Sequence, residues 1–421
     1  MTIALAGELS RRDPQQVITA LARLKAPLAA KMWLAAANIY RLDPVQEIGS
    51  ELAAGQKLQA TEIADYIAAS LPLHCTDGWA YLGRALGALI QGDAPGALHF
   101  GYYASLRGAM GLLAAQSVGV FDKRHVVLGS KGKARPIAAA GGTHPFVWNA
   151  LEVWATSNEA GRRLPTLFRL SGSSLEDWLE EFNPGFDLVS KSTEWQKRWG
   201  LNPARLRDDQ VLRNRASYRP SEYATGRDTG VRRSTALLDS LWRASEPVSA
   251  PFGLLVRHLI RISIEYAAAE TGLTGAKYQR AVVETVEAMV PIGDRAGWVS
   301  FLLRTTEPDD LLILQLARAS SGYGTTSEHA EVIARAFVVL AVSTLVCADL
   351  LSTAGLGRRK LAFWWRRLGA ERGLWARSAP PKRSEDLWDD VRVALDEVGA
   401  WTSKQSSPLP SNSIWRLKLA K

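Results

Sequence analysis

The chain has only two cysteines among its 421 residues, Cys75 and Cys347, and they form no CxxC or other metal-ligand spacing. Their scarcity excludes a disulfide framework, so we expect two small buried thiols in a reducing compartment. A P-loop, a G-x-S-x-G elbow and an H-E-x-x-H helix are missing as well. Residues 129–133, GSKGK, lack the P-loop spacing and its final hydroxyl, which leaves at most an anion-binding loop. The sequence therefore predicts no cofactor and no metal.

The N-terminus has no basic start followed by a long apolar run, so we expect no secretory leader. Residues 336–357 have the length of a membrane span. They contain Asp349, however, and a charge inside a span costs about 2.5 kcal/mol or more. Glu328, Glu331 and Arg335 share one face of the preceding turns, which suits a helix with a hydrated end. We expect a buried core helix in a cytoplasmic protein; the alternative is a membrane-associated effector.

Helical periodicity is abundant. Residues 14–70 carry apolar side chains at three- and four-residue spacing. The pairs Asp13-Pro14 and Asp43-Pro44 each place a good N-cap before a proline suited to the first helical turn. The expected fold class is mainly α, with a helical bundle in the N-terminal half and a second helical block. Near residues 126–142, a β-prone run and a Gly-rich loop predict a small hairpin.

The length fits two or three domains, each able to bury its own core. Residues 200–233 are rich in Arg, Asp, Asn, Pro and Gly with little periodicity, which favours a long connecting region. The expected parts are a helical domain over 1–190, a basic Arg-rich connecting region over 191–233, a second helical domain over 234–377 and a Pro/Ser-rich basic tail with one helix over 378–421.

Residues 98–126, LHFGYYASLRGAMGLLAAQSVGVFDKRHV, begin with Tyr-Tyr-Ala and run through small residues to Leu-Leu, a turn and a His. This stretch of roughly thirty residues resembles the HEPN superfamily (higher eukaryotes and prokaryotes nucleotide-binding). The resemblance implies an all-helical bundle of prokaryotic defence or toxin systems, often acting on RNA. Many HEPN ribonucleases carry an Arg and, after four to six residues, a His that together polarise the 2′-hydroxyl and the scissile phosphate. None of the six histidines here has such an Arg upstream, so that hallmark is absent.

On the helix expected at the start of this stretch, His99, Tyr103 and Arg107 follow at i, i+4 and i+8 beside an apolar face. Such a stripe can hold a phosphate, because Arg offers a bidentate fork and His and Tyr offer donors. In HEPN proteins with the Tyr-Tyr-Ala pattern, a His often stands at the position that Arg107 has here, and a later His corresponds to His125. The catalytic candidates are therefore Arg107 with His125, or His99 and Tyr103; the alternative is a non-catalytic scaffold. His144, at a helix start, is expected to be a local cap.

The charge is unevenly distributed. Residues 191–233 carry eleven Lys/Arg against five Asp/Glu, and residues 358–421 carry fourteen against seven, whereas the rest is mildly acidic. Basic segments on an acidic body favour nucleic acid as a partner. In the first segment arginines interleave with tyrosines just after Trp195 and Trp199, which suits stacking on single-stranded nucleic acid. The alternative is a loop pinned by salt bridges. The expected nucleic-acid-binding residues are Lys197, Arg198, Arg213, Arg215, Arg219, Arg232, Arg233 and Tyr218.

The second basic segment combines tryptophan with arginine, as interface anchors do. The expected partner-binding residues are Trp364, Trp365, Arg366, Arg367 and Trp375; the alternative is a Trp-rich helix packed on its own core. Together these features predict a non-catalytic or weakly catalytic subunit of a prokaryotic antiviral defence complex that binds RNA, single-stranded DNA or other defence proteins. The second hypothesis is a divergent, metal-independent HEPN-type ribonuclease using Arg107 and His125. The third is the membrane-associated effector.

Overall fold

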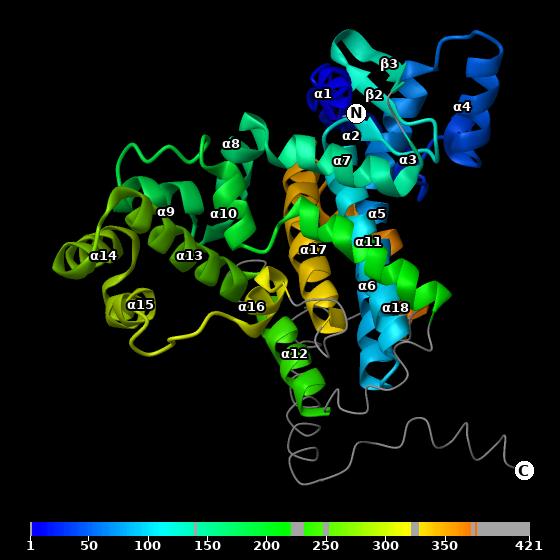
Figure 1. The fold of residues 1–421 in the computed structure, drawn as a ribbon. Coiled ribbons are helices and arrows are strands. Elements are labelled where there is room, and N and C mark those ends of the chain that lie inside the picture. The colour runs from blue at the N-terminus through cyan, green and yellow to red at the C-terminus, as the bar shows by residue number, and fades with distance from the viewer. Residues whose placement is uncertain are drawn as a thin grey trace, which may run out of the picture.

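The computed structural model describes residues 2–138, 141–219, 231–246, 252–320, 328–371 and 375–376. It is mainly helical with a few short strands, which confirms the expected fold class (Figure 1). The α-helices are α1 (Thr2–Leu9), α2 (Gln15–Arg23), α3 (Lys25–Ala29), α4 (Pro44–Ala53), α5 (Ala60–Ile90), α6 (Ala94–Ala115), α7 (Thr143–Ala155), α8 (Asn158–Leu167), α9 (Leu175–Phe182), α10 (Ser192–Arg198), α11 (Pro203–Tyr218), α12 (Val231–Ala244), α13 (Gly253–Thr271), α14 (Gly275–Met289), α15 (Arg295–Leu302), α16 (Leu312–Arg318), α17 (Glu328–Thr353) and α18 (Arg358–Glu371). Short 3-10 turns are η1 (Ile39–Arg41), η2 (Ser130–Gly132) and η4 (Ile292–Asp294).

The strands form two small sheets. β1 (Val118–Gly119), β2 (Val126–Gly129) and β3 (Lys133–Pro136) are antiparallel neighbours in that order, and β4 (Arg169–Leu170) pairs with β5 (Ser173–Ser174). The β2–β3 hairpin is the predicted insertion, with Val127 opposite Arg135. One of the two predicted caps is confirmed, since the Asp43 side chain accepts from the Gln46 amide at 2.9 Å at the start of α4. The other is wrong, because α2 begins one residue later than expected, with Pro14 at the N-cap position and no side-chain cap.

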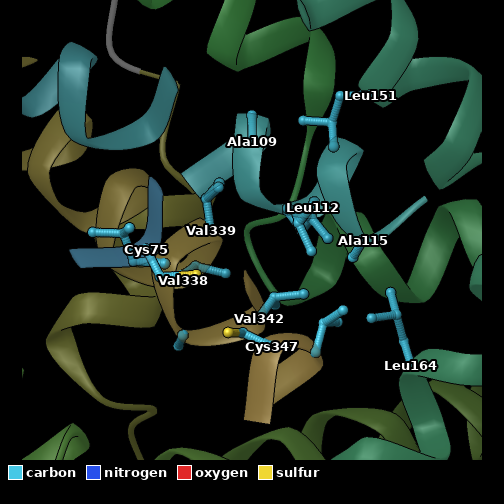
Figure 2. Close-up of a cluster of buried hydrophobic side chains, with 14 of the residues drawn as sticks. Cys75, Ala109, Leu112, Ala115, Leu151, Leu164, Val338, Val339, Val342 and Cys347 are labelled. Atoms are coloured by element: carbon cyan, nitrogen blue, oxygen red, sulfur yellow. The ribbon is translucent and has the colours of Figure 1, made fainter. Parts of the chain in front are cut away.

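The core is built around three long helices, α5, α6 and α17, which pack against one another (Figure 1). α17 is buried along most of its length, because it is surrounded by other helices and apolar on nearly every side. Both cysteines lie in this core, as expected for buried small residues (Figure 2). Cys75 comes from α5 and Cys347 from α17, the two thiols contact each other, and Cys75 Sγ lies 3.2 Å from Ser343 Oγ.

Small residues on α6 allow α17 to approach closely. A Cβ atom added at Gly108 would lie 2.9 Å from Val339 Cγ1, and one added at Gly111 would lie 2.5 Å from Ser343 Oγ. Contacts that short are sterically forbidden, so these positions admit only glycine at this helix separation. The run of small residues after the two tyrosines is therefore a packing surface for α17.

α17 also includes the run that has the length of a membrane span. Among the described residues it is the one helix long and apolar enough to cross a membrane, and 61% of its most apolar window is buried inside the protein. Its first turns are not hydrated as expected, because Glu331 and Arg335 are both buried. Arg335 instead forms a bidentate ion pair with Asp209, at 2.7 and 2.9 Å. At the other end, Asp349 pairs with Arg163 at 3.1 Å.

The basic segment after residue 200 is not a connecting region over its first half, because Pro203–Tyr218 form α11. Asn202 caps this helix by accepting from the Ala204 amide, and Pro203 occupies its first turn. The buried face of α11 includes the charged Asp209, so the sequence lacks the regular spacing of apolar residues that predicts a helix. The prediction missed the helix because the counter-ion of Asp209, Arg335, lies far away along the chain.

A second group of helices lies beside this core. α9 packs on α13 and α14, α10 packs on α8 and α13, and α14 packs on α15, on the left in Figure 1. The grouping does not follow the expected contiguous parts: α9 and α10 precede residue 200 yet both pack on α13, whereas α17 returns to α5 and α6.

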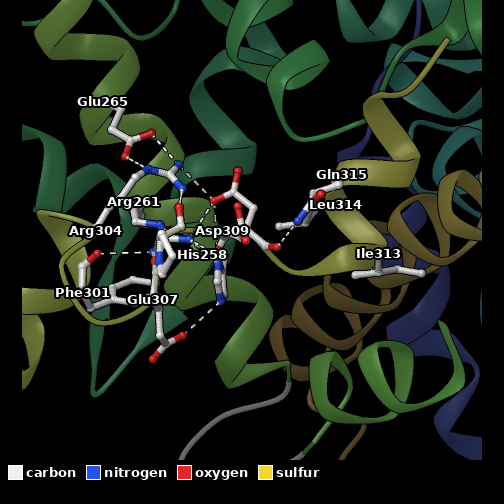
Figure 3. A network of polar contacts seen from close by, with 12 residues as sticks. His258, Arg261, Glu265, Phe301, Arg304, Glu307, Asp309, Ile313, Leu314 and Gln315 are labelled. Carbon is white, nitrogen blue, oxygen red and sulfur yellow. Dashed lines mark hydrogen bonds and ion pairs between the residues drawn. The ribbon is translucent and has the colours of Figure 1, made fainter. Parts of the chain in front are cut away.

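An ionic network fastens the loop before α16 to α13 (Figure 3). The Asp310 carboxylate accepts from Arg261 at 2.8 Å, from Arg318 at 2.7 Å and from Arg304 at 3.1 Å. Burial alone would raise the pKa of Asp310, but the hydrogen bonds from His258, Arg318 and Arg261 hold it well below its usual range. These contacts make Asp310 the electrostatic centre of the second group.

Candidate functional site

Polar and aromatic side chains from α5, α6, α7 and α11 gather where α6 meets the other three helices. We call this group the polar–aromatic cluster, and its members are Tyr81, His99, Tyr102, Tyr103, His144, Trp148, Arg213 and Ser217. α11 packs on both α6 and α7, so the contacts between these helices place residues distant in sequence side by side. Within the cluster His99, Tyr103, His144 and Arg213 are half-buried, which leaves part of each side chain accessible to a ligand.

The buried side of the cluster is a hydrogen-bonded chain. The Trp148 Nε1–H donates to the Tyr102 hydroxyl at 3.1 Å, and that hydroxyl lies 2.7 Å from Nδ1 of His144. Because the indole N–H can only donate, the Tyr102 hydroxyl accepts from it and is free to donate its own proton to His144. Burial raises the pKa of Tyr102 to about 12, so the hydroxyl keeps this proton at neutral pH. The hydrogen bond from Tyr102 therefore orients the His144 ring from the buried side of the cluster.

Arg213 covers the same groups from α11. Its guanidinium carbon lies 5.0 Å from the ring centre of Tyr102 and 5.2 Å from that of Tyr103, and its Nη2 lies 3.3 Å from Nε2 of His144. The Arg213 Nε is buried and has no hydrogen-bond partner among the described residues. Cation–π contact fixes the guanidinium but leaves this donor unused.

The second histidine of the cluster is His99. Its ring centre lies 4.9 Å from that of Tyr103, and its Nδ1 lies 2.9 Å from the Ser217 hydroxyl. Tyr103 also contacts the His144 ring at 6.0 Å, so one tyrosine separates the two imidazoles. Burial, aided by the charge of Arg213, lowers the pKa of His99 and of His144. Both histidines are therefore neutral at pH 7.

The predicted stripe of His99, Tyr103 and Arg107 divides in the structure. Arg107 is directed to α5, where its Nη1 lies 3.3 Å from Nδ1 of His74 and 3.9 Å from the carboxylate of Asp77. Burial, together with Arg107, lowers the pKa of His74 to about 3. Arg107 thus has its described polar contacts outside the cluster that contains the other two candidates.

His125 is a structural residue in this conformation. It is 0% exposed and stacked on Phe146 with ring centres 3.7 Å apart. Its Nδ1 accepts from the Phe121 amide at 3.1 Å, and its Nε2 donates to the Gly141 carbonyl at 3.1 Å. A fully enclosed imidazole with both nitrogens bonded cannot reach a substrate, so the proposed pairing of Arg107 with His125 has no support here. Its burial lowers the pKa of His125 to about 4.

The expected nucleic-acid-binding residues have different surroundings. Lys197 pairs with Glu194 at 2.8 Å, and Arg198 lies over the Tyr266 ring at 4.6 Å. Tyr218, at the end of α11, is 80% exposed, and Arg215 and Arg219 flank it with interactions of their own. The side chains of Arg232 and Arg233 lie outside the described residues.

The tryptophans upstream of this segment do not offer stacking surfaces. Trp195 and Trp199 are each 1% exposed. Trp195 donates to the Leu188 carbonyl at 2.9 Å and Trp199 to the Ser263 hydroxyl at 3.1 Å, so both belong to the core. The alternative interpretation, that salt bridges hold the arginine-rich segment to the rest of the protein, applies to Arg207, which pairs with Glu152 of α7 at 2.6 Å.

The expected partner-binding residues lie on or beside α18. Trp364 turns inward and meets Trp33 edge-on at 5.5 Å. Trp365 is 47% exposed, and the Trp375 ring lies 5.4 Å from it. The Trp375 indole also donates to the Arg366 carbonyl at 3.3 Å. Arg367 pairs with Glu371 at 2.6 Å.

No family model, no curated protein and no solved structure matches this chain. The cluster therefore has to be interpreted from its own chemistry. From the sequence, His144 was assigned to a cap, and Tyr81 and Ser217 were overlooked. The sequence feature that could have identified His144 is its position just after Gly141-Gly142, where the predicted hairpin ends and a helix begins.

Proposed function

We propose that this chain is a nucleic-acid-binding subunit of a prokaryotic antiviral defence complex, working in the cytoplasm, and that the polar–aromatic cluster holds a phosphate of its ligand. The observation that carries the proposal is Arg213, whose half-buried guanidinium lies beside His144 and Tyr103 and has no ion pair with any described carboxylate. Arginine with neighbouring His and Tyr donors suits a phosphodiester, which accepts several hydrogen bonds at once. The defence context rests on the resemblance of residues 98–126 to HEPN proteins.

A second candidate function, metal-independent ribonuclease activity, is favoured by the two neutral histidines on either side of Tyr103. One imidazole would take the proton of the ribose 2′-hydroxyl as that oxygen attacks phosphorus, and the other would give a proton to the leaving 5′-oxygen. A bound phosphodiester would raise the pKa of both histidines and so supply the protonated partner. Arg213 would neutralise the charge that develops on the phosphate oxygens.

Binding is tested by fluorescence anisotropy with labelled single-stranded RNA and DNA, between about 50 and 200 mM salt. Arg213→Ala is expected to weaken binding about tenfold or more and to flatten the salt dependence, because one phosphate contact is lost. The matched control is Arg205→Ala on the same helix, whose guanidinium is exposed and 3.7 Å from Asp208. Equal affinity of both variants and wild type would refute a phosphate site at Arg213.

Cleavage is measured on the same RNA in the presence of EDTA. The ribonuclease candidate requires that His99→Ala and His144→Ala each lose cleavage while still binding, since an acid and a base are both needed. If the wild-type chain binds RNA tightly but does not cleave it, the ribonuclease candidate is refuted and the non-catalytic binding role is supported. Loss of cleavage in His125→Ala alone would instead identify His125, which is buried in this structure, as the catalytic residue.

A further inference from the structure

A groove of about 820 Å³ lies between the short helix α3 and α18, and none of its lining residues belongs to the polar–aromatic cluster. Three aromatic residues line it, and Trp33 contacts both Trp364, at 5.5 Å, and Phe363, at 6.4 Å between ring centres. Its charged lining residues are Lys31, Arg359, Lys360, Arg366, Arg367 and Glu371. A concave site of this volume, with apolar rings and a few polar groups, is typical of small-molecule binding.

The groove is strongly cationic. Five basic side chains face a single carboxylate, and that carboxylate, Glu371, is already paired with Arg367 at 2.6 Å. Within the described part of the chain, Lys31, Arg359, Lys360 and Arg366 form no ion pair. Unpaired cations in a concave wall concentrate the positive potential and attract an anion with several charges.

The order of residues on α18 alternates charge with aromatic rings. Two rows run along the helix, each with an aromatic residue one turn from a cation on either side. These rows are Arg359–Phe363–Arg366 and Lys360–Trp364–Arg367. A ligand with a planar ring can pack against the aromatic residues while its phosphates reach the neighbouring cations.

From these observations we propose that the α3–α18 groove binds a nucleoside polyphosphate, with its base against Trp33, Phe363 and Trp364 and its phosphates at Lys31 and Arg359. A nucleotide fits better than a docked helix, because α3 has five residues and is only about 7.5 Å long. The charge of a di- or triphosphate also balances the excess of cations over Glu371. This site is separate from the cluster at α6, so it does not depend on the function proposed there.

Isothermal titration calorimetry of the whole chain with ATP, GTP, inorganic triphosphate and adenosine tests the proposal. Saturable binding of at least one nucleotide is expected, with a Kd on the order of 1 to 100 µM. Inorganic triphosphate and adenosine should each bind about tenfold more weakly, since each lacks half of the contacts. Arg359→Glu and Lys31→Glu should each weaken nucleotide binding by about tenfold or more.

The matched control is Arg280→Glu, which reverses an exposed arginine on α14 in the second group of helices. It should bind the nucleotide as the wild type does. Failure of ATP and GTP to bind at about 1 mM, equal binding of inorganic triphosphate, or unchanged binding in Arg359→Glu would each overturn the proposal. Binding of an acidic peptide in place of both nucleotides would overturn it too and assign the groove to a protein. Arg213→Ala should leave nucleotide binding intact, which separates this test from that of the cluster.

Discussion

Arg335 of α17 and Asp209 of α11 form a bidentate ion pair at 2.7 and 2.9 Å with both side chains almost completely enclosed. This pair joins the central helix of the core to the helix that carries Arg213. A buried ion pair contributes little net stability but costs a great deal when one partner is removed, because the other charge stays in a medium of low dielectric. The position of the candidate site therefore depends on this contact.

Removing one partner is expected to be far worse than removing both. Asp209→Ala should lower the free energy of unfolding by about 3 to 5 kcal/mol, since the buried Arg335 loses its bidentate partner and keeps only the longer contact with Glu331, at 3.6 Å. The triple variant Asp209→Leu/Glu331→Gln/Arg335→Met, which also removes the charge of Glu331 beside Arg335, should recover much of that loss. Urea denaturation followed by circular dichroism gives both values. Asp208→Ala, which breaks only the exposed contact with Arg205, should cost less than about 1 kcal/mol. An effect of Asp209→Ala as small as this control would contradict the argument.

The close approach of α6 to α17 gives a second prediction. Gly108→Ala places a Cβ 2.9 Å from Val339 Cγ1 and should destabilise the protein by about 1 to 3 kcal/mol through overpacking. Gly87→Ala on α5 is the matched change, because a Cβ there meets nothing within 4 Å. It should stabilise by up to about 1 kcal/mol, as alanine does in a helix. Thermal unfolding of the two variants measures both effects. A change in stability of the same sign in both variants would refute the argument that α6 packs too closely on α17 for a side chain at Gly108.

Burial of His125 predicts a pH-dependent loss of stability. Its pKa is about 4 in the folded chain, below the ordinary value of 6.5, so the folded state prefers the neutral ring. The stabilisation is fully present above pH 6.5 and is lost as the pH falls towards 4. The shift corresponds to roughly 3 kcal/mol in total.

His125→Gln keeps an acceptor and a donor but cannot titrate. The fall in the free energy of unfolding between pH 7 and pH 4.5 should therefore be smaller in this variant than in the wild type, by up to roughly 3 kcal/mol. Other histidines with lowered pKa values, His74 among them, contribute equally to both chains and cancel in the comparison. Identical pH profiles for the two chains would show that His125 does not carry this dependence.

The ionic network around Asp310 supplies a fourth prediction. Asp310→Asn removes the charge that Arg261, Arg304 and Arg318 share, so it should destabilise the second group of helices by about 3 kcal/mol or more. Hydrogen exchange should rise first in α13 and in the loop before α16. The neighbouring change Asp309→Asn should have little effect, because the Asp309 side chain is exposed and only its backbone carbonyl accepts from Arg261. Similar exchange in both variants would argue against Asp310 as the centre.

The sequence predicted those parts of the fold that local chemistry controls. The N-cap of α4, the hairpin around Gly129 and Lys133 and the buried thiols all follow from residues close together in the chain or from composition. α11 was missed because one of its inward-facing residues is a carboxylate, Asp209, which looks like a solvent-exposed residue until Arg335 is known to face it. Periodicity reports burial only where the buried residues are apolar.

The candidate site was predicted only in part. His99 and Tyr103 lie one helical turn apart, so their contact is a property of the helix alone. His144 and Arg213 join them through the packing of α7 and α11 on α6, which no spacing in the sequence encodes.

By itself, then, the sequence determined the helical class, the cap of α4, the hairpin and the neighbours along each helix, because hydrogen bonding and side-chain geometry act over a few residues. Only the tertiary structure decided that His125 is enclosed, that Arg107 turns to α5 and that Arg213 covers His144. Those outcomes depend on which helices pack together, and packing is set by the fit of whole surfaces across the molecule.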